Sequence, residues 1–241
     1  MSRSTIWTSI ADTLSTEIAR GQYRPGDKLP TEATLAGRFG VNRHTVRHAL
    51  AALAEAGTVY SRRGAGVFVT AQPTDYALGR RVRFHQNMLA SGRMPSRRIS
   101  LLETRPANEN EAAALALATG AMVHVMEGVS LADDSPIAAF RSVFDAIRFP
   151  TLLAELETIP SVTAAFAACG LRDYTRASTR ITATRASAVL ALSLRIAEGA
   201  PVLRSEAINI DGAERPVEFG LTWFAGDRVT LTVSPDDLGP Q

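Results

Sequence analysis

The chain has 241 residues, of which 46% are hydrophobic and 21% charged, and its formal net charge is +2. These values lie near the average of globular domains and exclude collagen, a coiled coil and wholesale disorder. The apolar stretches fall short of the roughly 18 residues that span a bilayer, and no apolar signal segment follows Met1. With Cys169 as the single cysteine, we expect a cytoplasmic protein with no disulfide and no membrane partner.

Three helices are predicted at the start of the chain. Apolar residues recur every four positions over residues 6–20, and two shorter helices are predicted over residues 31–39 and 42–56. Thr31 and Asn42 are suited to cap the second and third helices. The third helix is expected to turn these residues inward: Val46, Ala49, Leu50 and Leu53.

The rest of the chain predicts strands mixed with helices. Residues 71–80 are polar and turn-prone, which predicts a linker between a first domain, 1–70, and a second, 81–241. Helices are expected at 108–118, 161–168 and 185–195. Strands are expected at 124–131, 137–145, 174–183, 202–210, 217–224 and 229–233. The predicted fold class is therefore α+β, with a small helical domain followed by an antiparallel sheet.

A glycine-rich basic hairpin over residues 59–69 follows the third helix, and this order predicts a winged helix-turn-helix. Residues 1–72 hold nine basic and five acidic side chains, which favours a nucleic-acid partner. Arg43, His44 and Arg47 share the helix face opposite the core, and Arg43 is placed to reach a guanine edge. The alternative is that these arginines merely solvate an exposed helix face.

The remaining contacts of such a domain would be with the DNA backbone. Asn42 and the amides of the third helix are suited to hold phosphate. Arg62 and Arg63 lie where a wing meets the backbone or the minor groove, and Gly64 allows a close approach.

Three segments resemble the DNA-binding domain of GntR-family transcription regulators. They are residues 23–32 (YRPGDKLPTE), 35–47 (LAGRFGVNRHTVR) and 63–69 (RGAGVFV). The resemblance covers residues 6–69, and it departs from many members at Ala33, where they have an arginine that helps contact DNA. The residues expected at the DNA are Thr31, Asn42, Arg43, His44, Thr45, Arg47, Arg62, Arg63 and Gly64.

The second domain resembles the UTRA effector domain of the HutC subfamily, which has a chorismate-lyase-like fold. The similar segments are residues 84–95, the helix ending at Gly120, the turn at 133–136, and residues 216–219 before 226–228. Two other effector domains of GntR regulators do not fit the sequence. The metal-binding type needs more histidines than the second domain has, and the aminotransferase-like type needs a cofactor lysine, but no lysine follows Lys28. Residues 83–89 and 176–186 resemble regulators of phosphonate metabolism, which implies a repressor that senses a small phosphonate or phosphate-type anion.

The expected effector site combines donors from several segments. Strand alternation predicts that Arg176, Ser178, Arg180 and Thr182 share one face. Related sugar-phosphate sensors have two arginines at positions that align with Gly128 and Ser130, and Arg141 is expected to compensate for their absence. The effector-binding residues expected are Arg83, Phe84, His85, Gln86, Asn87, Arg141, Arg176, Arg180, Glu218, Thr222 and Phe224.

Three functions stay open at this point. The first is a ligand-responsive repressor, expected to bind a palindromic operator as a homodimer, with the linker as its hinge. The second is an enzyme, although no nucleophile–base pattern is visible and neither a catalytic residue, a metal nor a cofactor is expected. The third is a constitutive DNA-bound factor whose second domain only dimerises.

Overall fold

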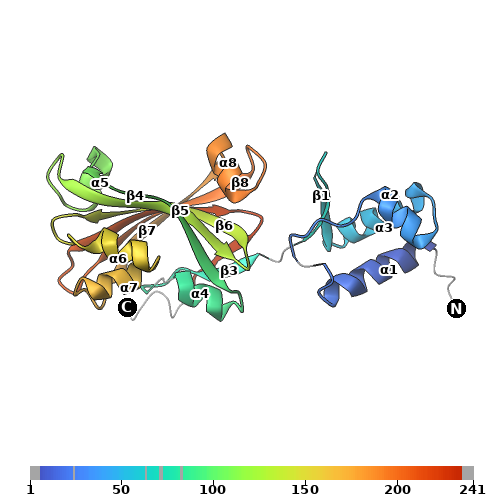
Figure 1. The fold of residues 1–241 in the computed structure, drawn as a ribbon, viewed down its shortest axis with the longest axis horizontal. Helices are drawn as coiled ribbons and strands as arrows, with labels where there is room; N and C mark the ends of the chain where they lie inside the picture. Colours follow the sequence, from blue (N-terminus) through green and yellow to red (C-terminus); the bar gives the residue numbers. More distant parts are fainter. Residues whose placement is uncertain (1–5, 24, 63, 71–72, 82–83, 235–241) are drawn as a thin grey trace. The chain divides into compact units, whose positions relative to one another are not determined.

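The computed structural model describes residues 6–23, 25–62, 64–70, 73–81 and 84–234 (Figure 1). The chain divides into two compact units, residues 1–72 and residues 73–241. Each unit has hydrophobic clusters of its own, so each is described by itself.

The first unit is a three-helix bundle with a hairpin. Its elements are α1 (Ile6–Ala19), α2 (Glu32–Phe39), α3 (Arg43–Glu55), β1 (Val59–Arg62) and β2 (Gly66–Val69). Its core joins Leu14 of α1, Leu35 of α2 and Val46 of α3, all of them fully buried. The four inward positions predicted on α3 are buried as expected: Val46, Ala49, Leu50 and Leu53.

Both predicted helix caps form. The Thr31 Oγ1 accepts a hydrogen bond from the backbone N–H of Thr34 at 3.2 Å. The Asn42 Oδ1 accepts one from the backbone N–H of Thr45 at 2.9 Å. Because each cap satisfies an otherwise unpaired N–H, it fixes the residue at which its helix begins.

The second unit is built on a curved, six-stranded antiparallel sheet with the strand order β4-β5-β6-β9-β8-β7. The strands are β4 (Pro95–Pro106), β5 (Met122–Ala132), β6 (Ser135–Asp145), β7 (Thr175–Arg185), β8 (Pro201–Ile210) and β9 (Pro216–Ala225). The β5–β6 hairpin turns at Asp133 and Asp134, whose φ angles of 47° and 65° are those of a type I′ turn.

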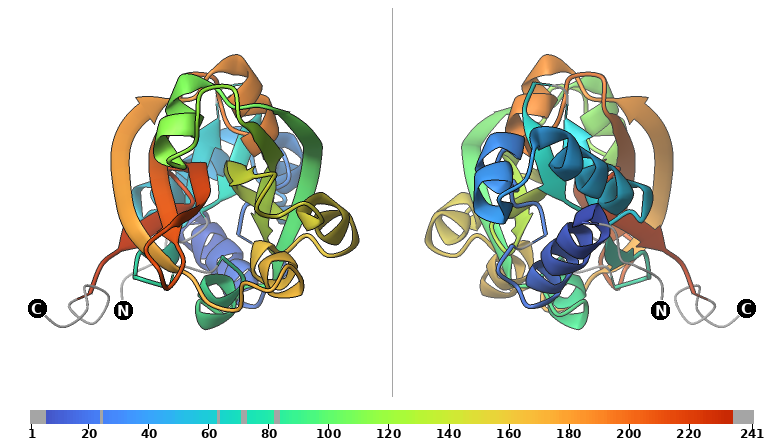
Figure 2. Two further views of the ribbon diagram at one scale, coloured as in Figure 1. Left: turned by 90° about the vertical axis from the view of Figure 1, so that its left-hand side faces the viewer. Right: turned by 90° about the vertical axis from the view of Figure 1, so that its right-hand side faces the viewer.

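Five helices lie on the two faces of this sheet. They are α4 (Phe84–Ala90), α5 (Glu109–Ala114), α6 (Leu152–Thr158), α7 (Val162–Ala168) and α8 (Ala188–Leu194). In Figures 1 and 2, α4, α6 and α7 gather on one face, while α5 and α8 lie over the other. Phe144 of β6 packs edge-to-face on Phe166 of α7, with 5.5 Å between ring centroids, so α7 is anchored to the first face.

The expected linker differs from the structure. Residues Thr74–Ala77 form β3, which pairs in parallel with β10 (Val229–Thr232) as a separate two-stranded sheet. Tyr76 on β3 is buried and packs on Phe224, with 5.0 Å between ring centroids. This strand therefore belongs to the second unit, and a hinge over the whole of 71–80 is wrong. The polar composition hid a strand whose alternate residues are buried.

Candidate functional site

The exposed side of α3 carries the arginines of the candidate DNA-binding surface. Arg43 and His44 are exposed in the first turn of the helix, and neither is hydrogen-bonded or ion-paired to another described residue. Arg47 is exposed one turn later, but its guanidinium is already engaged by Glu32. Its Nε and Nη2 donate to the two carboxylate oxygens at 3.0 and 2.6 Å. This pairing lowers the pKa of Glu32 and leaves Arg43 as the unpaired arginine of this face.

The residues at the helix starts have a structural role, which was predicted for Thr31 and Asn42 and which Thr45 shares. Thr45 adds a second hydrogen bond to the Asn42 cap, from its Oγ1 to the Asn42 Oδ1 at 3.0 Å. Thr31 holds the first turn of α2, where its Oγ1 lies 2.8 Å from the Oγ1 of Thr34. Each cap satisfies one N–H group, and the N–H groups of a first helical turn that stay uncapped are the kind that holds a phosphate.

The hairpin that follows α3 holds Arg62 against aromatic side chains. The Arg62 guanidinium lies over the Phe68 ring at 5.6 Å and over the Tyr60 ring at 6.0 Å from their centroids. Gly64 at the tip has a φ of +75°, a conformation that side chains disfavour. Arg63 lies outside the described residues.

A cavity of about 570 Å³ lies in the second unit, on the sheet face that carries α4 and α7. Its floor comes from β6, β9, β8 and β7, and its walls come from β3, α4, the start of β4 and the start of α7. Its size is in the range of small-molecule sites. Of the expected effector residues, it brings together Phe84, His85, Arg176, Glu218, Thr222 and Phe224.

A chain of hydrogen bonds crosses the cavity floor. Glu218 is buried and accepts from Ser142 Oγ at 2.7 Å and from Asn209 Nδ2 at 2.6 Å. The Oδ1 of Asn209 accepts in turn from Arg176 Nε at 2.7 Å, and Arg176 also donates to Thr179 at 3.0 Å. The floor therefore presents one carboxylate and one guanidinium whose orientations are fixed by neutral partners.

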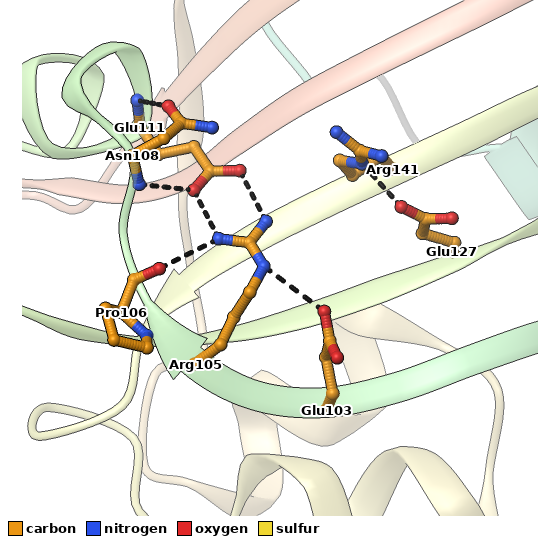
Figure 3. A network of polar contacts seen from close by, with 7 residues as sticks. All are labelled: Glu103, Arg105, Pro106, Asn108, Glu111, Glu127 and Arg141. Atoms are coloured by element: carbon orange, nitrogen blue, oxygen red, sulfur yellow. Dashed lines mark hydrogen bonds and ion pairs between the residues drawn. The ribbon is translucent and has the colours of Figure 1, made fainter.

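Two arginines expected in this site lie elsewhere. Arg141 points to the opposite face of the sheet, where its Nε donates to Glu127 at 2.6 Å (Figure 3). Arg180 lines a second hollow on that same face, together with Ser178. Arg141 and Arg180 therefore do not line the cavity that holds Arg176 and Glu218, contrary to the expectation that all four share one site.

A β-bulge explains the error on β7. The pairing with β8 shifts between Arg176 and Ser178, so that Arg176 lies opposite Asn209 while Ser178 lies opposite Ile208. A shift of one residue moves every later side chain to the other face of the sheet. Arg176 thus faces the cavity, while Ser178 and Arg180 do not.

Around α4 the expected residues are divided. Phe84 and His85 line the cavity, and His85 is exposed at its edge. Asn87 does not line it, and its Nδ2 donates to the backbone oxygen of Ala77 at 2.9 Å, which ties α4 to β3. Arg83 and the side chain of Gln86 lie outside the described part of the chain.

Arg97 on β4 also belongs to this cavity, although no sequence pattern predicted it. Its guanidinium lies between the Phe140 ring, at 4.9 Å, and the Phe84 ring, at 5.2 Å. The side chain lines the cavity, and its buried Nε has no hydrogen-bond partner. Burial lowers the pKa of Arg97, while Tyr76 and Glu218 oppose that shift.

The position of Arg97 is close to where related sugar-phosphate sensors have two arginines, at the positions of Gly128 and Ser130 in this chain. Arg97 lies directly opposite Ser130 on β5, so the two residues share one sheet face. At Gly128 an added Cβ would lie 2.3 Å from the backbone oxygen of Arg98, which leaves no room for any side chain. Arg97, rather than Arg141, therefore brings a guanidinium to this region, and only knowledge of the strand register could have revealed it.

The described part of the chain has neither a candidate metal cluster nor a helix that could span a membrane. Within the described ranges, no group of three or more His, Cys, Asp and Glu side chains is arranged to hold a metal ion. Within those same ranges, no helix is long and apolar enough to cross a membrane.

Comparisons with known proteins agree with this architecture. Residues 7–69 match the gntR family of bacterial regulatory proteins, and residues 90–230 match the UTRA domain. The probable transcriptional regulator PhnF of Escherichia coli (strain K12) is 34% identical over 95% of both chains. The transcriptional repressor NagR of Bacillus subtilis (strain 168) is 28% identical over 97% of this chain and 96% of its own.

A solved structure of a related regulator has a similar fold. PhnF from Mycobacterium smegmatis superposes with a TM-score of 0.66 at 25% identity, covering 95% of this chain and 98% of its own. The chain therefore belongs to the GntR family of transcription regulators, with a UTRA domain of the HutC type. These relatives are regulators and not enzymes, so the enzyme alternative is set aside. Regulators of this type bind operator DNA and a small effector, the latter through the UTRA domain.

Proposed function

We propose that this regulator is a homodimeric repressor of genes for the uptake or breakdown of phosphonates or phosphate. We further propose that a small anion of that kind is its effector. The observation that carries the proposal is the cavity of the UTRA domain, which holds two guanidiniums against one carboxylate. Such a site favours a ligand with a phosphonate or phosphate group, which carries about −1.5 to −2 charges and several strong acceptors. The resemblance of residues 83–89 and 176–186 to regulators of phosphonate metabolism supports this class of genes, beside the likeness to PhnF of E. coli over 95% of both chains.

For the DNA contacts, we propose direct base reading by Arg43 and backbone or minor-groove contact by Arg62. Arg43 is exposed and unpaired at the start of α3, where a recognition helix enters the major groove. Arg62 is held by two rings on the hairpin, which suits a positioning contact. A single winged helix reads few bases, so a dimer on two half-sites supplies the remaining specificity.

The dimer surface we propose lies in the second unit. Val189 and Leu192 on α8 are 77% and 82% exposed, and they lie three residues apart on one short helix. Burying them against a second copy would remove apolar surface from water. A monomer in light scattering at micromolar concentration, with equally tight binding to an isolated half-site, would contradict the dimer.

The test of the effector is calorimetry with inorganic phosphate, alkylphosphonates and sugar phosphates, on the free protein and on the operator complex. A ligand that weakens DNA binding must bind the complex less tightly by the same factor, because coupling is reciprocal. An anionic ligand with different affinities for the two forms supports the proposal. If no compound of the panel binds, a constitutive DNA-bound factor is the better account.

A further inference from the structure

The charges of the side chains that line the effector cavity do not add up to zero. Arg97 and Arg176 bring two positive charges, and Glu218 brings one negative charge. His85 is the remaining ionisable side chain besides two tyrosines, and it is exposed at the edge. With the histidine neutral, the cavity carries one positive charge in excess. A partly desolvated charge without a counter-ion is costly, so the cavity favours a ligand with net negative charge.

The excess is localised on Arg97. Arg176 and Glu218 are linked through Asn209, so both have hydrogen-bond partners. No hydrogen bond or ion pair joins Arg97 to another described residue, and its Nε is buried without a partner. The rings of Phe84 and Phe140 flank its guanidinium and hold it in place. Aromatic rings attract a cation through their faces, so the two rings do not accept hydrogen bonds from the N–H groups in the guanidinium plane. Those N–H groups can therefore donate to a ligand.

Glu218 provides the negatively charged hydrogen-bond acceptor of the cavity. Each of its two oxygens accepts one hydrogen bond, from Ser142 and from Asn209. An ionised carboxylate offers about four acceptor positions, so Glu218 keeps capacity for a donor from a ligand. Because the side chain is held by two donors, it does not swing over to neutralise Arg97.

We propose that Arg97 anchors the anionic group of the effector, and that the effector is bipolar, with a phosphonate or phosphate at Arg97 and an ammonium at Glu218. The net charge of such a molecule, near −1, matches the excess in the cavity. A planar guanidinium offers paired donors to two oxygens of a phosphonate, which no neutral lining group can do. This inference rests on the proposed function, because it specifies the ligand of the same cavity.

The experiment measures binding by calorimetry with the full chain at pH 7.5. The probes are 2-aminoethylphosphonate and ethylphosphonate, which differ only in the amine. The wild type should bind the amino compound at least about tenfold more tightly, as a charge-assisted hydrogen bond contributes that much. Arg97→Gln should weaken binding of both probes roughly tenfold to a hundredfold. Glu218→Gln should abolish the preference for the amino compound and leave ethylphosphonate binding unchanged or tighter.

Two controls separate binding from folding. Arg180→Gln removes an arginine on the other sheet face and should bind both probes as the wild type does. Arg97→Lys keeps the charge without the paired donors, and it should retain part of the affinity that Arg97→Gln loses. Unfolding midpoints without ligand accompany each variant. If Arg97→Gln does not fold, Arg97→Lys and Glu218→Gln carry the test.

The outcomes distinguish this inference from the proposed function. Equal binding by the wild type and Arg97→Gln, or no preference for the amine, overturns the inference. If a phosphonate alters operator affinity equally in the wild type and Arg97→Gln, the proposed function stands and the inference fails. If 2-aminoethylphosphonate binds through Arg97 without changing operator affinity, the inference stands and the proposed function fails. A wild type that binds neither probe overturns both.

Discussion

Arg105 and Arg97 of the second unit lie in surroundings unlike those of Arg43 in the first unit. On α3 of the first unit, Arg43 extends into water, where its charge can attract a polyanion from a distance. In the second unit, Arg105 is paired with a buried carboxylate, and Arg97 is enclosed by two rings. An exposed arginine can be lost with little effect on stability but with a large effect on a partner. An enclosed arginine is tied to the fold or to a ligand.

The largest effect is expected at the pair of Arg105 and Glu111 shown in Figure 3. Arg105 donates to both carboxylate oxygens of Glu111 at 2.7 and 2.8 Å, and only 3% of the Glu111 side chain is exposed. Arg105→Met should lower the free energy of unfolding by about 3–5 kcal/mol, because a buried carboxylate is left without its partner. Urea unfolding measures the change.

The matched control is Arg141→Met in the same region. Arg141 also pairs with a glutamate, Glu127, but both side chains are about one-third exposed. Its loss should cost less than about 1 kcal/mol. Equal losses for the two variants would mean that burial of the pair does not decide its importance.

The second prediction concerns DNA binding by the first unit. Arg43→Ala should weaken specific binding by about 1–3 kcal/mol and relax base preference at one position of each half-site. Arg62→Ala should weaken binding to all sequences alike and flatten its salt dependence. Fluorescence anisotropy with specific and scrambled duplexes, each at several salt concentrations, separates the two effects. Identical changes in both variants would refute the division between helix and hairpin.

The contrast between the units also explains what could be predicted from sequence. The helices and caps of the first unit depend on residues three or four apart, so Thr31 and Asn42 were recognisable as caps. The cavity depends on register between distant strands. The bulge after Arg176 and the pairing of Arg97 with Ser130 leave no local pattern in the sequence.

Some elements of the second unit were missed for related reasons. β4 is an edge strand rich in arginine and serine, with residues half-exposed on one face and exposed on the other over much of its length. Its composition resembles a polar loop more than a strand. The short helices α4 and α6 were also missed. α6 begins without a side-chain cap hydrogen bond, whereas α7 and α8, which also span seven residues each, begin at the capping residues Ser161 and Ser187.

The third prediction is a loss of stability of the second unit at acidic pH. The Arg105 guanidinium lowers the pKa of Glu111 from its ordinary 4.5. Burial alone would raise the pKa of Asp211, but hydrogen bonds from the Arg215 backbone and from Arg148 outweigh it and lower that pKa well below 3.8. Carboxyls with lowered pKa values stabilise the fold above their unfolded pKa values, and this stabilisation is lost as the pH falls through the folded ones.

We therefore expect the unfolding free energy to fall as the pH drops below about 5, and to go on falling below pH 3 because the folded pKa of Asp211 lies well below 3.8. Once the pH is below a folded pKa, the loss is about 1.4 kcal/mol for each unit by which that pKa is lowered. Trp223 reports on the second unit, and Trp7→Phe removes the other tryptophan signal. Arg105→Met should show a shallower fall, because the Glu111 contribution is gone. The same slope in both proteins would show that Glu111 does not contribute.

The smallest effect is expected at Glu32, where the first unit pairs an arginine in the open. Glu32 holds one donor edge of Arg47, formed by its Nε and Nη2, so that edge is not available to a phosphate as long as the pair persists. Glu32→Gln removes a negative charge from the DNA-facing side and frees the guanidinium. Affinity for non-specific duplex should rise by less than about tenfold, and the salt slope should steepen by up to about one counter-ion. Glu17→Gln is the matched control, because it breaks the ion pair with Arg38, which the proposal does not place at the DNA. A rise of equal size in both variants would show that the change in net charge alone raises the affinity. A rise confined to Glu32→Gln would show that the ion pair with Glu32 restrains Arg47.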